Sequence, residues 1–228
     1  VRLEGMDALR AHLRAVHSMG VRIITRISPE YPKRLLAAMG RQAPLLLYCA
    51  GALSLLDTPC VSLVGSRKLR EPGRDFARAV GRAAASSGKT YVSGGAVGAD
   101  TEGFSGAWRA GGRAILFLPD SLRERIGRMG ASLQSGRLLL VSLDGPDQSF
   151  SVRRAFARNS LIHAMGEKVF VAQTDQGRGG TWQGVTENLE QHWSPVYMCS
   201  QEPEDPGTAA LIRQGAAPLR TADIPDMI

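Results

Sequence analysis

Two short apolar segments that each end in a loop of small residues constrain the fold of this chain more than any other feature. Residues 61–64 are apolar and run into the turn 65–67, and residues 90–92 run into the glycine-rich loop 93–100. The segment between them is predicted to be a helix over about 73–87. A strand, a helix and a second strand in this order form half of a doubly wound sheet, in which parallel strands end at the same edge. We therefore expect both loops, and the functional site, at that edge.

The rest of the chain continues the alternation of strands and helices. The predicted fold class is therefore α/β: an extended Rossmann-like, doubly wound and mostly parallel sheet with helices on both faces. We expect residues 1–55 to form an N-terminal extension packed on the core and residues 56–228 to form the Rossmann-like domain. The tail from residue 217 is expected to be mostly irregular. Further strands are predicted at residues 22–25, 45–49, 114–118, 137–142, 168–173 and 196–199, and further helices at residues 4–19, 31–39, 101–110, 121–135, 152–165, 181–192 and 208–214.

The charge of the chain is unevenly distributed. The formal net charge is +7, and residues 67–158 hold sixteen Lys or Arg against eight Asp or Glu. A basic centre suits a polyanion such as nucleic acid, although an arginine-rich genome would also give an arginine-rich surface. Because the three cysteines are widely separated and the histidines lack ligand spacing, we predict no metal site and a cytoplasmic setting. No segment resembles a signal peptide or a membrane span, so no membrane partner is expected.

Three loops follow strands that should be parallel, and they define the candidate site. Glycine allows the backbone to approach a ligand closely, and the free amides at the start of a following helix attract phosphate. One such loop is weak evidence, but three at one edge indicate a phosphate or nucleotide pocket. The residues that we assign to this pocket are Gly65, Ser66, Arg67, Ser93, Gly94, Gly95, Ala96, Gly98, Arg158, Asn159, Gly179, Gly180 and Thr181.

Arg67 is the side chain to which we give most weight, because a guanidinium can bind phosphate through two parallel hydrogen bonds. Arg158 and Asn159 join the site if their helix begins at the same edge, and the alternative for each arginine is a solvated surface position. Asp100 is expected to be a helix N-cap or to interact with the helix dipole. No catalytic residue is predicted, since no carboxylate or serine has a base partner that the sequence reveals.

The chain also carries several separated motifs in a particular order. They are Tyr31-Pro32-x-x-Leu35, PLLLY at 44–48, VGSR at 64–67, SGGAVGAD at 93–100, Gly111-Gly112, Phe156-x-Arg158-Asn159, and Gly207 with Leu211-Ile212-x-x-Gly215-Ala216. Together they resemble the DNA-processing protein A (DprA/Smf) family over roughly residues 20–225. Two positions depart from the family pattern: Phe104 stands where a histidine is usual, and the turn at 179–182 has an altered sequence.

The resemblance implies a non-enzymatic protein that needs no cofactor and binds single-stranded DNA in a basic pocket during DNA processing, recombination and natural transformation. It also implies a homodimer and a RecA-type recombinase as partner. The resemblance further implies that Arg67 binds phosphate, that the backbone of residues 94–98 forms a cradle for the ligand, and that Arg158 and Asn159 form part of the pocket wall. Two alternatives stay open: a sensor of a nucleotide or nucleotide derivative in a defence or signalling setting, and a nucleotide N-glycosidic hydrolase. The hydrolase is disfavoured because Gly184 stands where its signature has a glutamate.

Overall fold

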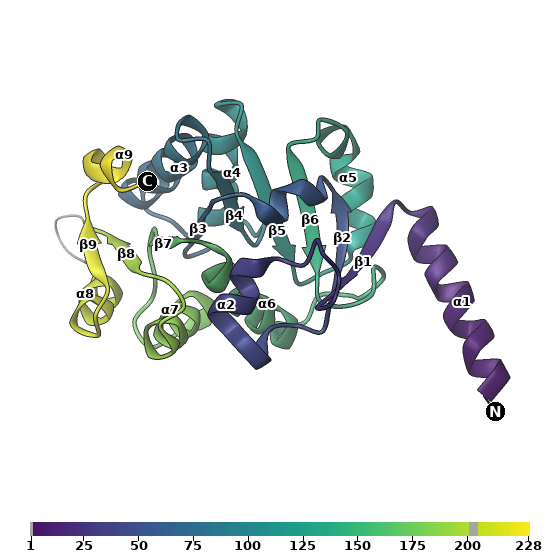
Figure 1. Cartoon of the computed structure of the whole chain (residues 1–228). Coiled ribbons are helices and arrows are strands. Elements are labelled where there is room, and N and C mark those ends of the chain that lie inside the picture. The colour runs from purple at the N-terminus through teal and green to yellow at the C-terminus, as the bar shows by residue number, and fades with distance from the viewer. Residues whose placement is uncertain (1, 201–204) are drawn as a thin grey trace.

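One sheet organises the protein, as the computed structural model shows (Figure 1). The structure describes residues 2–200 and 205–228, and within them nine strands pair in the order β1-β2-β6-β5-β4-β3-β7-β8-β9. The strands are β1 (Val21–Thr25), β2 (Leu46–Gly51), β3 (Cys60–Val64), β4 (Thr90–Ser93), β5 (Arg113–Leu118), β6 (Leu138–Ser142), β7 (Lys168–Val171), β8 (Val196–Cys199) and β9 (Ala217–Leu219).

The order in which the strands are added to the sheet reverses at β3. Strands β3, β4, β5 and β6 follow one another toward one edge, whereas β7, β8 and β9 are added on the other side of β3, and all seven are parallel. Strands β1 and β2 extend the sheet beyond β6 through two antiparallel pairings. The prediction of a mostly parallel, doubly wound sheet is confirmed. The carboxyl ends of β3 and β7 form the topological switch point, where sheets of this kind bind their ligands.

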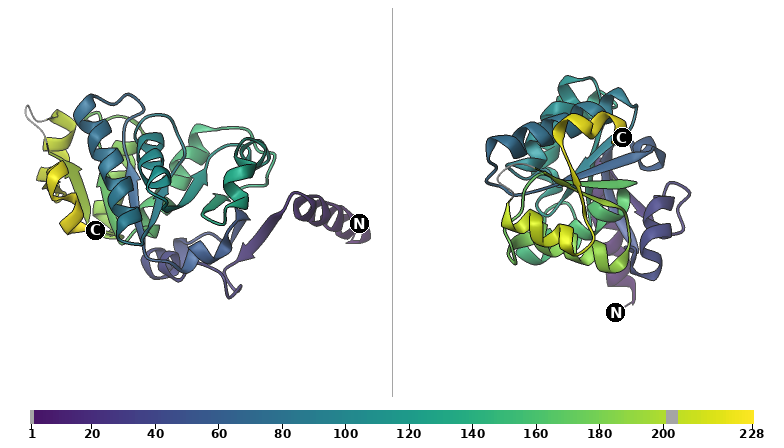
Figure 2. Two further views of the ribbon diagram at one scale, coloured as in Figure 1. Left: turned by 90° about the horizontal axis from the view of Figure 1, so that it is seen from above. Right: turned by 90° about the vertical axis from the view of Figure 1, so that its left-hand side faces the viewer.

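Helices cover both faces of the sheet, as Figures 1 and 2 show. Helices α3, α4, α5 and α9 lie on one face, and α2, α6, α7 and α8 lie on the other. Helix α1 extends away from the body of the protein, and its apolar residues Met6, Leu9 and Leu13 are exposed. The helices are α1 (Arg2–Ser18), α2 (Lys33–Met39), α3 (Glu71–Ser86), α4 (Ala99–Arg109), α5 (Leu122–Gln134), α6 (Val152–Met165), α7 (Gly179–Gln191), α8 (Pro206–Arg213) and α9 (Ile224–Met227), and the short 3-10 turns are η1 (Gly40–Gln42), η2 (Leu53–Asp57) and η3 (Thr221–Asp223).

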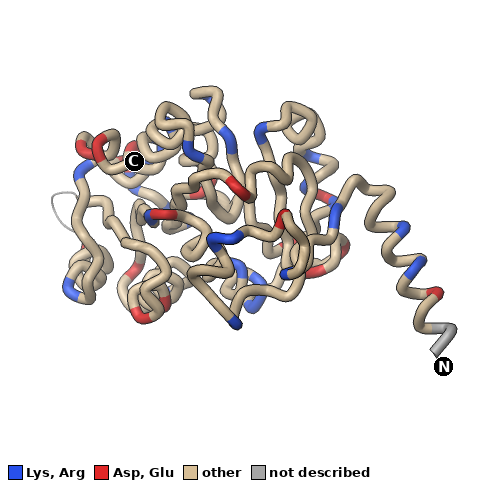
Figure 3. Tube along the Cα trace, viewed as in Figure 1, with Lys and Arg blue, Asp and Glu red and all other residues tan. Residues whose placement is uncertain are grey.

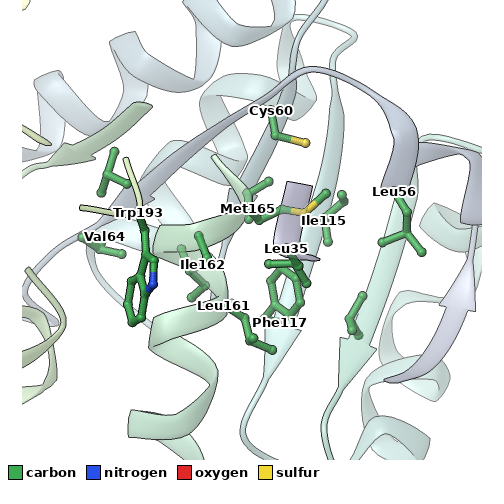
Figure 4. Packing of buried hydrophobic residues seen from close by; sticks show 14 of the residues in the cluster. Leu35, Leu56, Cys60, Val64, Ile115, Phe117, Leu161, Ile162, Met165 and Trp193 are labelled. Carbon is green, nitrogen blue, oxygen red and sulfur yellow. The ribbon is translucent and has the colours of Figure 1, made fainter. Parts of the chain in front are cut away.

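Two apolar clusters, one on each face, hold these layers together. On the α6 face, Leu161, Ile162 and Met165 pack against the sheet residues Ile115 and Phe117 (Figure 4). On the other face, α3 and α4 pack on the same central strands through a second set of fully buried side chains. The parallel strands are therefore apolar on both faces, as buried strands of an α/β sheet should be.

The prediction of an irregular tail after residue 217 is wrong. Residues 217–219 form the edge strand β9, which pairs in parallel with β8, and the chain then ends in η3 and α9. Proline is compatible with an edge strand, where a missing amide breaks no ladder bond, so Pro218 does not prevent the pairing. Leu219 and Ile224 are buried against the α3 face. Among the residues that the structure describes, no helix is both long and apolar enough to cross a membrane.

Candidate nucleic-acid interface

A cavity of about 870 Å³ opens at the switch point of the sheet. The loop after β3, residues 65–70, forms one wall, and the segment after β7 that leads into α7, residues 173–181, forms another. The first turns of α6 close the third side. Its volume lies in the range of small-molecule and cofactor sites, and its position is the one at which doubly wound sheets bind ligands.

The two walls at the strand ends are hydrogen-bonded to each other through Gln173. The backbone amide of Ser66 donates to the Gln173 carbonyl at 2.8 Å, and the amide of Arg70 donates to the Gln173 side-chain oxygen at 3.0 Å. Within the first loop, the amide of Lys68 donates to the hydroxyl of Ser66 at 3.1 Å. These bonds fix the backbone of the loop, so the side chains of Arg67 and Lys68 project from a defined position.

Three exposed cations, Arg67, Lys68 and Arg178, stand around the mouth of the cavity, and we call them the cationic rim. Among the described residues, no carboxylate lies within 4.0 Å of any of the three. Arg70 also lines the cavity, but its guanidinium forms an ion pair with Asp205. The exposed carboxylate of Asp175 also lines the cavity but pairs with none of these three cations, so the cationic rim keeps a net positive charge that attracts an anionic ligand.

The first turn of α7 adds backbone donors to the cavity wall. Gly179, Gly180 and Thr181 line the cavity, the helix has no side-chain cap at Arg178, and its first turn holds no acidic residue. Uncapped amides at a helix N-terminus carry partial positive charge and bind phosphate. The rim and this turn together form an anion-binding surface on two sides of the cavity.

The helix predicted at residues 121–135 contributes less free positive charge than its three arginines suggest. Helix α5 does form, with a kink at Met129, but each of its three arginines has an acidic partner. Figure 3 likewise shows acidic residues interspersed with basic ones over much of the chain. Net charge alone therefore does not single out a candidate surface, whereas the three cations of the rim do, because none of them pairs with a carboxylate of the described residues. The pairs on α5 and beside it are Arg123 with Asp147, Arg125 with Asp120, and Arg128 with Glu124.

Arg158 lies at the floor of the cavity rather than on an exposed wall. Its residue exposure is 7%, and its guanidinium packs on Gly94 and lies 3.9 Å from the carboxylate of Asp100. Burial lowers the pKa of Arg158, and the charge of Asp100 opposes that shift. Burial raises the pKa of Asp100, and Arg158 opposes it in turn. The two groups form a desolvated ion pair, in which the loss of either partner would leave a buried charge.

The glycine-rich loop 93–100 supports the floor instead of surrounding the cavity. The carboxylate of Asp100 accepts the amides of Gly94 and Ala96, each at 3.2 Å, so these donors are already bonded. Of the two predicted roles of Asp100, the N-cap role is wrong, because Gly98 holds that position and the carboxylate binds loop amides. Asp100 does lie in the first turn of α4, where its charge suits the helix dipole. At Gly98, with φ of 86°, a side chain would lie 2.4 Å from the carbonyl oxygen of Ser66. The glycines let this loop pack against both the Arg158 guanidinium and the first wall.

The structure brings most of the predicted site residues to one cavity and leaves four outside its wall. Ser93 is fully buried and donates its hydroxyl to the Leu63 carbonyl at 2.8 Å. Asn159 donates to the Gly180 carbonyl at 3.1 Å and so connects α6 to α7. The predicted residues that line the cavity are Gly65, Ser66, Arg67, Ala96, Arg158, Asn159, Gly179, Gly180 and Thr181, and those that do not are Ser93, Gly94, Gly95 and Gly98.

Several cavity residues were absent from the sequence prediction. Lys68 and Arg178 adjoin predicted site residues, so the same loops could have indicated them, and Thr174 follows a predicted strand. His163 is fully buried beside the cavity, and burial lowers its pKa to about 3. Phe150 lies between the strand predicted at 137–142 and the helix predicted at 152–165, where the sequence analysis assigns no site residue. The lining residues that were not predicted as site residues are Val64, Lys68, Arg70, Asp100, Phe150, Val152, Ala155, Phe156, His163, Gln173, Thr174, Asp175 and Arg178.

Two glutamates of the chain, Glu102 and Glu187, are bonded to neighbouring side chains away from the cavity. No group of three or more His, Cys, Asp or Glu in the described part of the chain is placed to hold a metal ion. Glu102 is bonded to Arg74 and Arg78 between α3 and α4, and Glu187 accepts a hydrogen bond from the Ser160 hydroxyl at 2.9 Å. Neither carboxylate lines the cavity.

Residues 22–227 match the protein-family model described as DNA recombination-mediator protein A. The chain belongs to this family. No curated protein matches it. The match covers both walls of the cavity, its floor and the strands that position them, so the site lies within the family domain.

Solved structures of the DprA family have the same fold. DprA from Streptococcus pneumoniae is 24% identical, with a TM-score of 0.77 over 89% of this chain and 72% of that one. The DprA of Helicobacter pylori, solved in a study of its single-stranded DNA binding mode, is 24% identical with a TM-score of 0.73 over 91% and 93% of the chains. A molybdenum cofactor binding protein from Rippkaea orientalis is 17% identical, with a TM-score of 0.53 over 75% and 94%. The first two matches span nearly the whole of this DprA-family chain.

Proposed function

We propose that this DprA-family protein binds single-stranded DNA at the switch-point cavity. In this proposal the cationic rim and the first-turn amides of α7 hold consecutive phosphates of the strand. Phe156, which lines the cavity on α6, offers an apolar face to a base. The observation that carries the proposal is the set of three exposed cations without carboxylate partners around a cavity at the carboxyl ends of β3 and β7.

Family membership supports this ligand over others. The family is described as a recombination mediator, and the Helicobacter pylori relative is described as binding single-stranded DNA. We propose accordingly that the protein acts in DNA processing and recombination in the cytoplasm, as a homodimer that hands DNA to a RecA-type recombinase, without catalytic activity of its own. The cavity fits this role because its buried carboxylate, Asp100, is bonded to loop amides and to Arg158 rather than being free to transfer a proton.

Equilibrium titration of a fluorescently labelled oligothymidine tests this function. The anisotropy of the label should rise on binding, unlabelled single strands should compete, and a duplex of the same length should compete poorly. Binding should weaken steeply as salt is added, because phosphate contacts release counterions. A protein that leaves the anisotropy unchanged at low salt would refute the proposal.

A nucleotide sensor is the second candidate, and the size of the cavity favours it. A volume of about 870 Å³ exceeds what one nucleotide needs, and it lies within the range of small-ligand pockets. A free nucleotide that binds the folded state would raise the melting temperature by mass action. A thermal-shift panel of mononucleotides and dinucleotides, read beside the oligothymidine titration, separates the two: a sensor prefers a small ligand, and a DNA-binding protein prefers the strand.

A further inference from the structure

Phe150 is an exposed aromatic residue at the mouth of the cavity. Of the six phenylalanines in the chain, it is the one with an exposed side chain, at 49% exposure. Its neighbour on α6, Val152, is 62% exposed, and both residues line the cavity. We call Phe150 and Val152 the outer shelf. Exposed apolar groups gathered at the edge of a pocket indicate a surface that becomes covered when a ligand binds.

The outer shelf is held in place by Arg154. Its guanidinium donates to the carboxylate of Asp144 at 2.7 Å, to the Gln148 side chain at 2.8 Å and to the Ser149 carbonyl at 2.8 Å. At the other end of this loop, the hydroxyl of Ser151 accepts the amide of Arg154 at 3.1 Å and caps α6. Phe150 lies between two bonded residues, so its ring is presented on a fixed backbone and loses little conformational freedom when it is covered.

The outer shelf faces the cationic rim. The guanidinium carbon of Arg67 lies 5.9 Å from the centroid of the Phe150 ring. A ligand that covers the ring while meeting this cation needs a flat apolar face next to a negative charge. Nucleotides in a strand repeat these two features, because each base is followed by a phosphate. A protein surface that covered the shelf would instead have to place an acidic group directly beside an apolar one.

We propose that the outer shelf is a second base-binding subsite, on which the base next to the nucleotide held at the cavity stacks against Phe150. This inference rests on the proposed function, and it explains how the site would distinguish a DNA strand from a free nucleotide. The cavity is larger than one nucleotide needs, so a free mononucleotide held at the first turn of α7 leaves the shelf uncovered, whereas a strand contacts both. The shelf therefore makes the site prefer single-stranded DNA over the nucleotides that are abundant in a cell.

A thermodynamic cycle tests this subsite. The cycle compares two proteins, the wild type and Phe150→Ala, each with two ligands. The ligands are an intact oligothymidine and an oligothymidine with one abasic position, which is moved along the strand in a series. Stacking of one base on an aromatic residue predicts that Phe150→Ala weakens binding of the intact oligothymidine by about 5- to 150-fold. Against the abasic strand that lacks the stacked base, the same substitution should change the affinity less than about twofold, because the partner of the ring is already gone.

Controls separate the shelf from a general loss of structure. Phe150→Trp keeps a stacking face and should keep or raise the affinity, whereas Ile27→Ala removes another exposed apolar side chain, one that does not line the cavity, and should have no effect. Binding of thymidine monophosphate should be the same for wild type and Phe150→Ala. Equal losses on the intact strand and on every abasic strand would overturn the inference, and so would an unchanged affinity of Phe150→Ala. If the wild-type protein itself does not bind the oligothymidine, the proposed function fails and the subsite fails with it.

Discussion

The salt dependence of binding should report how many cations contact the strand, and Arg67→Ala should lower that number by one. Each phosphate neutralised on a single strand contributes about −0.7 to the slope of log K against log salt concentration. Three cations on the rim, Arg67, Lys68 and Arg178, predict a slope of about −2. The affinity should then fall about 20-fold between about 50 and about 200 mM salt, and only about 7-fold for Arg67→Ala.

The measurement is fluorescence anisotropy of labelled oligothymidine at four or more salt concentrations. Arg67→Lys should keep the slope of the wild-type protein, because the charge remains, but should bind more weakly at every concentration, because an ammonium cannot form the bidentate contact. Arg82→Ala is the matched control, since this exposed arginine on α3 does not line the cavity. If Arg82→Ala changed the slope as much as Arg67→Ala does, binding would be a diffuse surface effect and the assignment of the rim would be wrong.

Three further predictions concern the floor of the cavity. Asp100→Ala leaves Arg158 buried without a partner, so thermal denaturation should show a loss of about 3–5 kcal/mol, or roughly 6–20 °C in melting temperature. Gly94→Ala places a methyl group 1.6 Å from a guanidinium nitrogen of Arg158 and must displace it, so both the melting temperature and the affinity for oligothymidine should fall, while a loss of affinity alone would contradict this packing. His163 is neutral when folded because its pKa is about 3, whereas the unfolded chain takes up a proton below about pH 6.5, so stability is lost as the pH falls. Urea titrations at about pH 7 and about pH 5 should differ by about 2 kcal/mol for this residue, and His163→Leu should abolish that part of the difference.

The sequence predicts the fold well because its signals are local and strong. The apolar segments at 61–64 and 90–92, each followed by a glycine loop, appear as β3 and β4. The helix between them, α3, begins two residues before its predicted start and ends one residue before its predicted end. The prediction for the tail fails because such a local signal is missing there: β9 has only three residues and contains a proline. Its pairing with β8 depends on a sheet edge that only the folded chain provides.

The sequence predicts where the cavity forms, but it predicts only partly how each lining residue is placed. Sequence places the loops after β3, β4 and β7 at one edge, yet it does not reveal that β7 rather than β4 lies across the cavity from the β3 loop. Strand order decides this, because the cavity forms where the order reverses. Arg158 illustrates the second limit: an arginine in a motif looks the same in sequence whether it is exposed on the wall of a cavity or, as here, lies at its floor, buried against a carboxylate.

These observations separate the residues that build the cavity from those that choose its ligand. The motif residues Gly94, Asp100 and Arg158 are buried in a common network, so a change at any of them alters the backbone on which the walls rest. The exposed groups Lys68 and Phe150 lie outside the motifs through which the family is recognised, and they can change without disturbing that network. Motifs of this kind therefore identify the position and shape of the pocket more securely than its ligand. The affinity for a strand over a single nucleotide should depend on the rim and the outer shelf, which is where relatives with a different ligand would be expected to differ.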